Sequence, residues 1–146
     1  MKVKDILAEK GTDVATITGD TTVWQAMNKF AAQKVGSLLV LGGTGNIIGI
    51  IAARDVLMSV LKHRDKLDTM PVSEIMTKDI IVASPDDDLD YVEAIMTENR
   101  IRHVPIIENK ALAGIVSIGD LVKAQLKQTS VENRYLRDFI EGKYPA

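Results

Sequence analysis

The chain of 146 residues carries 18 Lys and Arg against 20 Asp and Glu, for a formal charge of −2, and it contains no cysteine. This composition excludes disulfides and thiolate metal sites and offers no basic patch for nucleic acid, so we expect a cytoplasmic protein without a nucleic-acid partner. The longest apolar run, residues 47–53, is far below the roughly 20 residues that span a bilayer, which predicts no membrane segment.

The hydrophobic residues are mainly aliphatic. Aromatic residues make up 4% of the chain and all hydrophobic residues 46%, so the core must be built from Val, Ile, Leu, Met and Ala. This mix is typical of domains in which helices cover a sheet.

Two similar halves make up most of the sequence. VKDIL at residues 3–7 recurs as VSEIM at 72–76, and a β-branched stretch follows each copy, at 14–18 and at 80–83. The β-branched stretches predict strands. This recurrence indicates an internal repeat.

A helix is predicted after each of these strands. The turns GDTT and SPDDD supply side-chain acceptors for the open amides at the start of a helix. Apolar residues then recur at helical spacing and give each helix one buried stripe. They are Val23, Ala26, Met27 and Phe30 in the first half, and Leu89, Val92 and Met96 in the second.

Two strands joined by a polar turn complete each half. SLLVL at 37–41 turns through GGTGN into GIIA, and HVPII at 103–107 turns through ENK into GIVS, with helices beginning near Asp55 and Asp120. The order in each half is strand, helix, strand, strand, helix. One copy leaves a sheet face uncovered, so we expect an α+β fold in which two copies pack with pseudo-twofold symmetry.

The boundaries follow from these patterns. We place the first repeat at residues 1–62, a charged linker at 63–71, the second repeat at 72–125 and a tail at 126–146. The tail predicts an amphipathic helix ended by Gly142. Its apolar face consists of Val131, Tyr135, Leu136, Phe139 and Ile140.

The segment RIRHVPIIENKALAGIVSIGDLV, residues 100–122, resembles the hallmark of the CBS family. In that family a helix leads to an apolar strand ending near proline and then to G-h-h-[ST]-x-x-D, where h is apolar. Residues 3–61 repeat the pattern more loosely. The resemblance implies a free-standing CBS pair, or Bateman module, that binds an adenosine-type nucleotide in the cleft between its repeats and commonly dimerises.

The motif also has a physical basis of its own. Ser117 ends a strand and Asp120 lies in the first turn of the next helix, where open amides and the helix dipole favour a phosphate. The Ser117 hydroxyl can donate to that phosphate, and the Asp120 carboxylate can accept hydrogen bonds from ribose hydroxyls. Asp120 could equally stabilise the helix terminus without any ligand.

The resemblance implies two unequal sites. The first consists of Ser117, Asp120 and the phosphate-facing Arg102, with Asp13, Ala15, Val35 and Gly36 from the first half. The second consists of Asp55, Arg54, Asp79, Ile81 and Ile101, although Arg54 could equally be a surface residue. Ala52 stands where the first site has Ser117, and Gly36 stands where it has Arg102. We therefore expect the Asp120 site to bind more tightly.

No nucleophile elbow, metalloprotease motif, phosphate loop or thiol is present, so we expect no enzyme, and His63 and His103 make a poor metal site. The expected ligand is AMP, with ADP, ATP and NADH as alternatives. Expected partners are a second copy of the chain and a regulated protein. The alternative function is a protein-interaction or dimerisation module with empty clefts that acts through the C-terminal helix.

Overall fold

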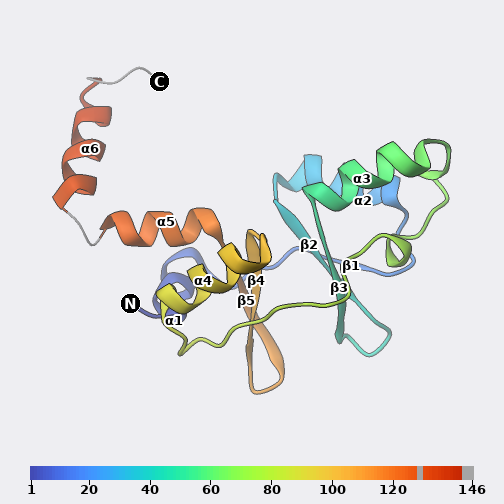
Figure 1. Cartoon of the computed structure of the whole chain (residues 1–146), viewed down its shortest axis with the longest axis horizontal. Coiled ribbons are helices and arrows are strands. Elements are labelled where there is room, and N and C mark those ends of the chain that lie inside the picture. The colour runs from blue at the N-terminus through green and yellow to red at the C-terminus, as the bar shows by residue number, and fades with distance from the viewer. Residues whose placement is uncertain (128–129, 143–146) are drawn as a thin grey trace. The chain divides into compact units, whose positions relative to one another are not determined.

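The computed structural model describes residues 1–127 and 130–142, which form two compact units (Figure 1). Residues 13–81 make up one unit, termed here the inserted unit. Residues 1–12 and the chain from residue 82 onward make up the other, termed the terminal unit. The first twelve residues therefore fold with the second half of the sequence.

A three-stranded sheet forms the centre of the inserted unit. The elements are β1 (Thr16–Thr18), α2 (Val23–Gln33), β2 (Ser37–Leu41), β3 (Ile47–Ala52), α3 (Ala53–His63) and the short 3-10 helices η1 (Arg64–Lys66) and η2 (Val72–Glu74). β2 pairs in parallel with β1 and antiparallel with β3. α2 packs on β2, and α3 packs on β3.

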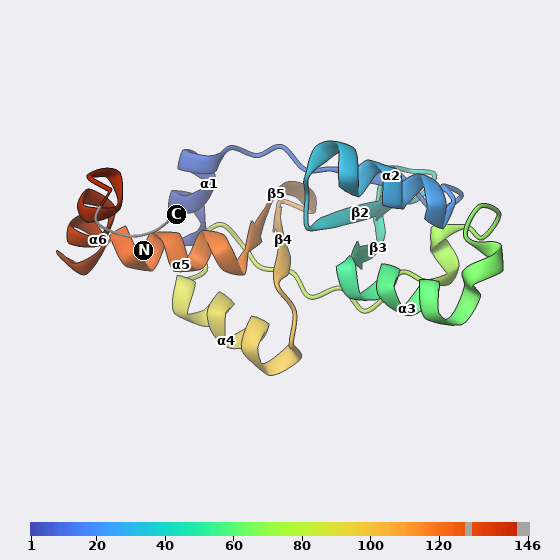
Figure 2. The same ribbon diagram turned by 90° about the horizontal axis from the view of Figure 1, so that it is seen from above.

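The terminal unit is built on a two-stranded hairpin. Its elements are α1 (Val3–Lys10), α4 (Leu89–Asn99), β4 (His103–Glu108), β5 (Ala111–Ser117), α5 (Ile118–Lys127) and α6 (Ser130–Ile140). α5 lies between α1 and α4 and contacts both (Figure 2). No helix in the described part of the chain is long and apolar enough to cross a bilayer.

Aliphatic side chains fill both cores, as the composition predicts. Val23, Leu38 and Ile51 are fully buried in the inserted unit, and Val104 and Val116 are fully buried in the terminal unit. The predicted tail helix is present as α6, and Gly142 beyond it has a φ of 76°, as suits a residue that ends a helix. The side chain of Val131 lies outside the described residues.

The strand predicted at residues 80–83 is wrong, because only one parallel bridge, between Ala83 and Ile106, forms there. In the inserted unit the corresponding ladder is extended by the Leu39 N–H, which donates to the Ala15 carbonyl at 3.0 Å. Pro105 occupies the position of Leu39 in the second repeat and has no N–H to donate. The second ladder therefore lacks this bond and is limited to a bridge.

Each repeat contributes its first segment to the other unit. Leu7 of α1 packs over Gly114 of β5, and Met76, which follows η2, packs over Gly49 of β3. A methyl group at Gly114 would lie 2.8 Å from Leu7 Cδ2, and one at Gly49 would lie 2.7 Å from Met76 Cγ. Glycine at both positions therefore lets the exchanged segment lie this close to the strand, with the tighter constraint at Gly49.

The substitution Gly49→Ala should destabilise the protein by about 1–3 kcal/mol, the usual cost of overpacking a filled core. The new methyl group would meet the stem of Met76, including Cβ at 3.1 Å, and the stem is fixed to the backbone. Gly114→Ala is the matched control, because there the nearest atom belongs to a terminal methyl group of Leu7 that can rotate away. Chemical denaturation measures both variants, and an equal or larger loss in Gly114→Ala would contradict this packing account.

Candidate functional site

The junction between β5 and α5 is closed by Ser117 and Asp120. The Ser117 N–H donates to Asp120 Oδ2 at 2.8 Å, and the Asp120 N–H donates to Ser117 Oγ at 3.1 Å. These reciprocal bonds form a capping box at the start of α5. The structure thus brings these two predicted site residues together and also gives them the helix-capping role considered from the sequence.

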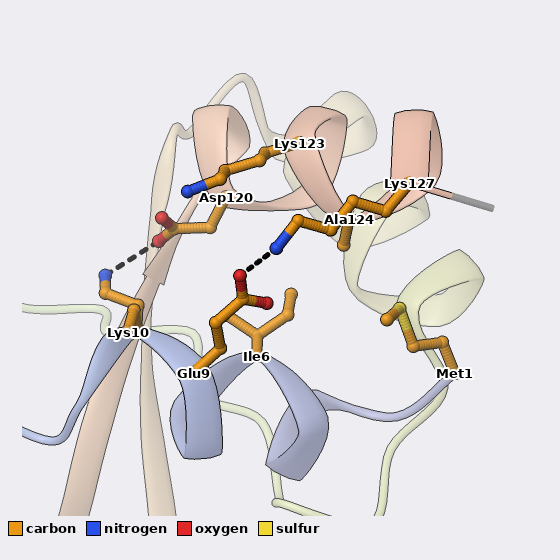
Figure 3. A pocket seen from close by; sticks show the side chains of 8 residues that line it. All are labelled: Met1, Ile6, Glu9, Lys10, Asp120, Lys123, Ala124 and Lys127. Atoms are coloured by element: carbon orange, nitrogen blue, oxygen red, sulfur yellow. Dashed lines mark hydrogen bonds and ion pairs between the residues drawn. The ribbon is translucent and has the colours of Figure 1, made fainter. Parts of the chain in front are cut away.

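A lysine from α1 contacts the same carboxylate. Lys10 Nζ lies 2.7 Å from Asp120 Oδ2 and donates to the Ile115 carbonyl at 3.0 Å (Figure 3). The Lys10 side chain is 33% exposed and that of Asp120 22% exposed, so solvent screens this ion pair only in part. Sequence analysis missed Lys10, because only the packing of α1 in the terminal unit places it beside residues that follow it by more than one hundred positions.

The Asp120 carboxyl group is held in its ionised form. Burial on its own would raise the pKa of Asp120, but the hydrogen bonds from Lys10 and Ser117 and the charge of Lys10 outweigh burial, so the pKa lies below the ordinary value. Asp120 is therefore an ionised group that only accepts hydrogen bonds at neutral pH.

Lys10 and Asp120 line a pocket that extends along α5 as far as Lys127. This pocket, of about 80 Å³, opens between α1 and α5, where Lys127 of α5 pairs with Glu9 of α1 (Figure 3). Its lining also includes Lys123. The two ion pairs, Lys10–Asp120 and Lys127–Glu9, both join α1 to α5, but only the first touches the capping box.

Arg102 and Ile101 lie next to this junction. The Arg102 carbonyl accepts a hydrogen bond from the N–H of Ile118, the first residue of α5, at 2.9 Å. Both residues line a shallow pocket of about 330 Å³ together with Ile118. The structure therefore brings Arg102, Ser117 and Asp120 to one end of the terminal unit.

His103 begins β4 and pairs with Ser117 across the hairpin. Burial lowers the pKa of His103, and the charges of Lys10 and Arg102 lower it further, while Asp120 opposes them in part. The neutral imidazole is therefore the form that the folded protein favours.

This preference predicts how stability depends on pH. The pKa of His103 is lower in the folded state than in the unfolded state, so the unfolded state binds more protons once the pH falls below about 6.5. The contribution of His103 is complete above that pH, and the free energy of unfolding then decreases by at most about 1.4 kcal/mol per pH unit. His103→Gln should remove this slope in denaturation experiments between pH 5 and 7.5, and an unchanged slope would contradict the assignment.

The inserted unit contains Asp55 and Arg54, which were predicted for the second site. Asp55 lies in the first turn of α3, where it accepts hydrogen bonds from the Ala52 N–H at 2.8 Å and from Thr77 Oγ1 at 3.3 Å. Ala52 has no hydroxyl to return the bond, so the capping is one-sided. Arg54 is exposed at the start of α3.

The remaining predicted residues also belong to the inserted unit. Asp13 is exposed before β1, Ala15 and Ile81 are half-buried, and Val35 and Gly36 form the turn between α2 and β2. The predicted sites combine these residues with residues of the terminal unit, and that combination stays a prediction. Within residues 1–127 and 130–142, no three His, Asp or Glu side chains cluster as a metal site would require.

The comparison with protein families decides the identity of the repeats. The family model described as "CBS domain" matches residues 3–62 and again 72–127. The chain belongs to the CBS domain family. The predicted α+β fold with tandem CBS repeats is thereby confirmed, and paired CBS domains of this kind are regulatory modules.

Relatives and solved structures agree with this assignment. A mitochondrial CBS domain-containing protein of Arabidopsis thaliana, CBSX3, is 32% identical over 97% of this chain and 73% of its own length. The crystal structure of the CBS-domain protein ATU1752 of Agrobacterium tumefaciens is similar with a TM-score of 0.82 and 39% identity, covering 85% of this chain and 92% of that one.

Two further solved structures share the fold. A putative signal-transduction protein with CBS domains from Burkholderia ambifaria superposes with a TM-score of 0.84 at 33% identity, covering 89% of this chain and 97% of that one. The CBS domain pair of protein MJ0100, solved in complex with 5′-methylthioadenosine and S-adenosyl-L-methionine, superposes with a TM-score of 0.74 at 24% identity, covering 85% and 98%. At that identity the likeness concerns the fold alone.

Proposed function

We propose that this CBS pair is a cytoplasmic regulatory module that binds an adenosine-type nucleotide and carries out no chemistry on it. AMP is the leading ligand, followed by ADP, ATP and NADH. The observation that carries the proposal is the ionised Asp120 carboxylate at the start of α5, which is anchored through one oxygen and lies beside the Arg102 turn.

The ribose would bind through the second oxygen of Asp120. Ser117 and Lys10 both donate to Oδ2, and no hydrogen bond to Oδ1 is found among the described residues. A carboxylate offers about four acceptor sites, so Oδ1 can take up both hydroxyls of a ribose. An ionised carboxylate suits this task better than a neutral acid because it has no proton to displace.

The phosphate would bind at the N-terminus of α5. Gly119 is exposed in the first turn, and its N–H makes no hydrogen bond to any described residue. The helix dipole and this open amide favour an anion. The Arg102 side chain is exposed at the adjacent turn and supplies a cation with several donors. The MJ0100 complex supports the proposal only in that a CBS pair of the same fold accommodates ligands containing adenosine.

The Asp55 site should be the weaker of the two. Thr77 Oγ1 already donates to Asp55 Oδ1, so the oxygen that corresponds to the open one of Asp120 has a partner. Ala52 and Gly36 also remove the hydroxyl and the cation that the Asp120 site has in Ser117 and Arg102.

Asp120→Asn should weaken AMP binding at least about tenfold, because hydrogen bonds to a charged group contribute about 1.5–3 kcal/mol each. The amide oxygen can still accept from the Ser117 N–H, so the helix cap survives. Asp55→Asn is the matched control, and the tighter binding event should persist in it. Isothermal titration calorimetry measures both variants, and undiminished AMP affinity in Asp120→Asn would remove Asp120 from the site.

A second candidate function rests on α6. Tyr135, Leu136, Phe139 and Ile140 expose 44–82% of their surface, so four large apolar side chains lie at the surface of this one helix. Under this proposal α6 would hold a second copy of the chain or a regulated protein.

Removal of residues 131–146 separates the two functions. For a nucleotide sensor that dimerises through α6, the shortened chain should bind AMP as the full chain does but elute as a smaller species in size-exclusion chromatography with light scattering. An intact chain that binds none of AMP, ADP, ATP and NADH, with assembly lost on truncation, would favour the interaction module.

A further inference from the structure

Lys10 contacts only one of the two oxygens of the Asp120 carboxylate, which is the group proposed to bind the ribose. Lys10 Nζ donates to Asp120 Oδ2 at 2.7 Å, and the Ser117 N–H donates to the same atom at 2.8 Å. Figure 3 shows the other carboxylate oxygen directed away from Lys10, on the side of Lys123. The two donors therefore fix the rotation of the carboxylate and leave Oδ1 in a defined direction.

Lys10 is itself held in place. Its ammonium group donates a second hydrogen bond, to the Ile115 carbonyl at 3.0 Å. Its backbone is held as well, because Lys10 is the last residue of α1. α1 is seated on the hairpin by Leu7 over Gly114. A cation tethered at both ends in this way orients its partner at a lower entropic cost than a freely moving surface lysine does.

We propose that Lys10 is a positioning residue for nucleotide binding, which anchors Asp120 through Oδ2 so that Oδ1 meets the ribose hydroxyls. This inference rests on the proposed function of Asp120. Lys10 itself does not contact the ribose in this arrangement. Its effect on affinity is exerted through the orientation and the charge state of Asp120.

The chain provides a matched control for this role. Lys127 of α5 pairs with Glu9, the residue that precedes Lys10 on α1. Lys127→Met therefore removes an ion pair between the same two helices without touching Asp120. An effect of Lys10 that came only from holding α1 against α5 would appear in Lys127→Met as well.

Lys10→Met should weaken AMP binding about tenfold in isothermal titration calorimetry, as loss of a contact that orients a binding group commonly does. Lys127→Met should bind as the wild type does. Lys10→Arg should recover most of the affinity, because its guanidinium can still donate to Oδ2. Lys10→Gln, which keeps a donor but no charge, serves as the second variant if Lys10→Met does not fold by circular dichroism.

A pH series provides a readout that a purely structural role would not move. Lys10 holds the pKa of Asp120 down. The other titratable or charged groups near this carboxyl are His103 on β4, Arg102 just before it, Lys123 and Lys127 on α5, and Glu9 on α1. In Lys10→Met and Lys10→Gln the pKa of Asp120 should rise, so AMP binding should be lost at a higher pH on acidification. The titration of AMP itself is common to all variants, and Lys127→Met should follow the wild type.

The outcomes are distinct. Wild-type affinity and an unchanged pH profile in both Lys10→Met and Lys10→Gln overturn the inference, as does tighter binding, which would make Lys10 a competitor for Asp120. An equal loss in Lys127→Met also overturns it. If the wild-type protein binds no adenosine nucleotide at all, the proposed function itself fails, which the wild-type titration reveals before any variant is compared.

Discussion

The packing of Leu7 over Gly114 determines how the candidate site is built. Because β5 has no side chain at residue 114, α1 approaches the hairpin closely and lies along α5. This position brings Lys10 to Asp120 and Glu9 to Lys127. The capping box at the start of α5 thereby gains a cation from the other end of the sequence, and the pKa of Asp120 stays below its ordinary value.

The same exchange occurs in the other direction with a different chemical result. Met76 packs over Gly49, and the next residue, Thr77, bridges to Ile50 and donates to Asp55. In each unit, then, the exchanged segment provides a hydrogen-bond donor to the aspartate that starts a helix. One donor is a lysine and the other a neutral hydroxyl, so two sites related by sequence repetition differ in charge. This difference adds to the loss of Ser117 and Arg102 at the second site and supports unequal ligand affinities.

Local patterns in the sequence predicted most of the fold. The two antiparallel hairpins and the helices that follow them were predictable because short apolar runs, polar turns and helical spacing are properties of neighbouring residues. The strand at 80–83 was predicted wrongly because it depends on a donor in another strand, where Pro105 has none. The exchange of first segments was not predictable, since VKDIL and VSEIM look alike and neither shows which glycine it will cover.

The candidate site was predictable to a similar extent. Ser117 and Asp120 could be predicted because they belong to one local motif. A hydroxyl and a carboxylate lie three residues apart where a strand meets a helix, and in the structure they bond to each other's backbone N–H groups. Lys10 was missed because it lies 110 positions before Asp120 in the sequence. The cap uses Oδ2 of Asp120, so the ribose contact proposed for Oδ1 would not compete with capping.

The most direct measurement is a titration of the isotopically labelled protein with AMP, followed by the backbone amide signals in NMR spectra. Binding at the proposed site predicts saturable shifts that are largest for Arg102, Ile118, Gly119 and Asp120, together with residues 13–15. The absence of saturable shifts, or shifts confined to α6, would contradict nucleotide binding at the start of α5.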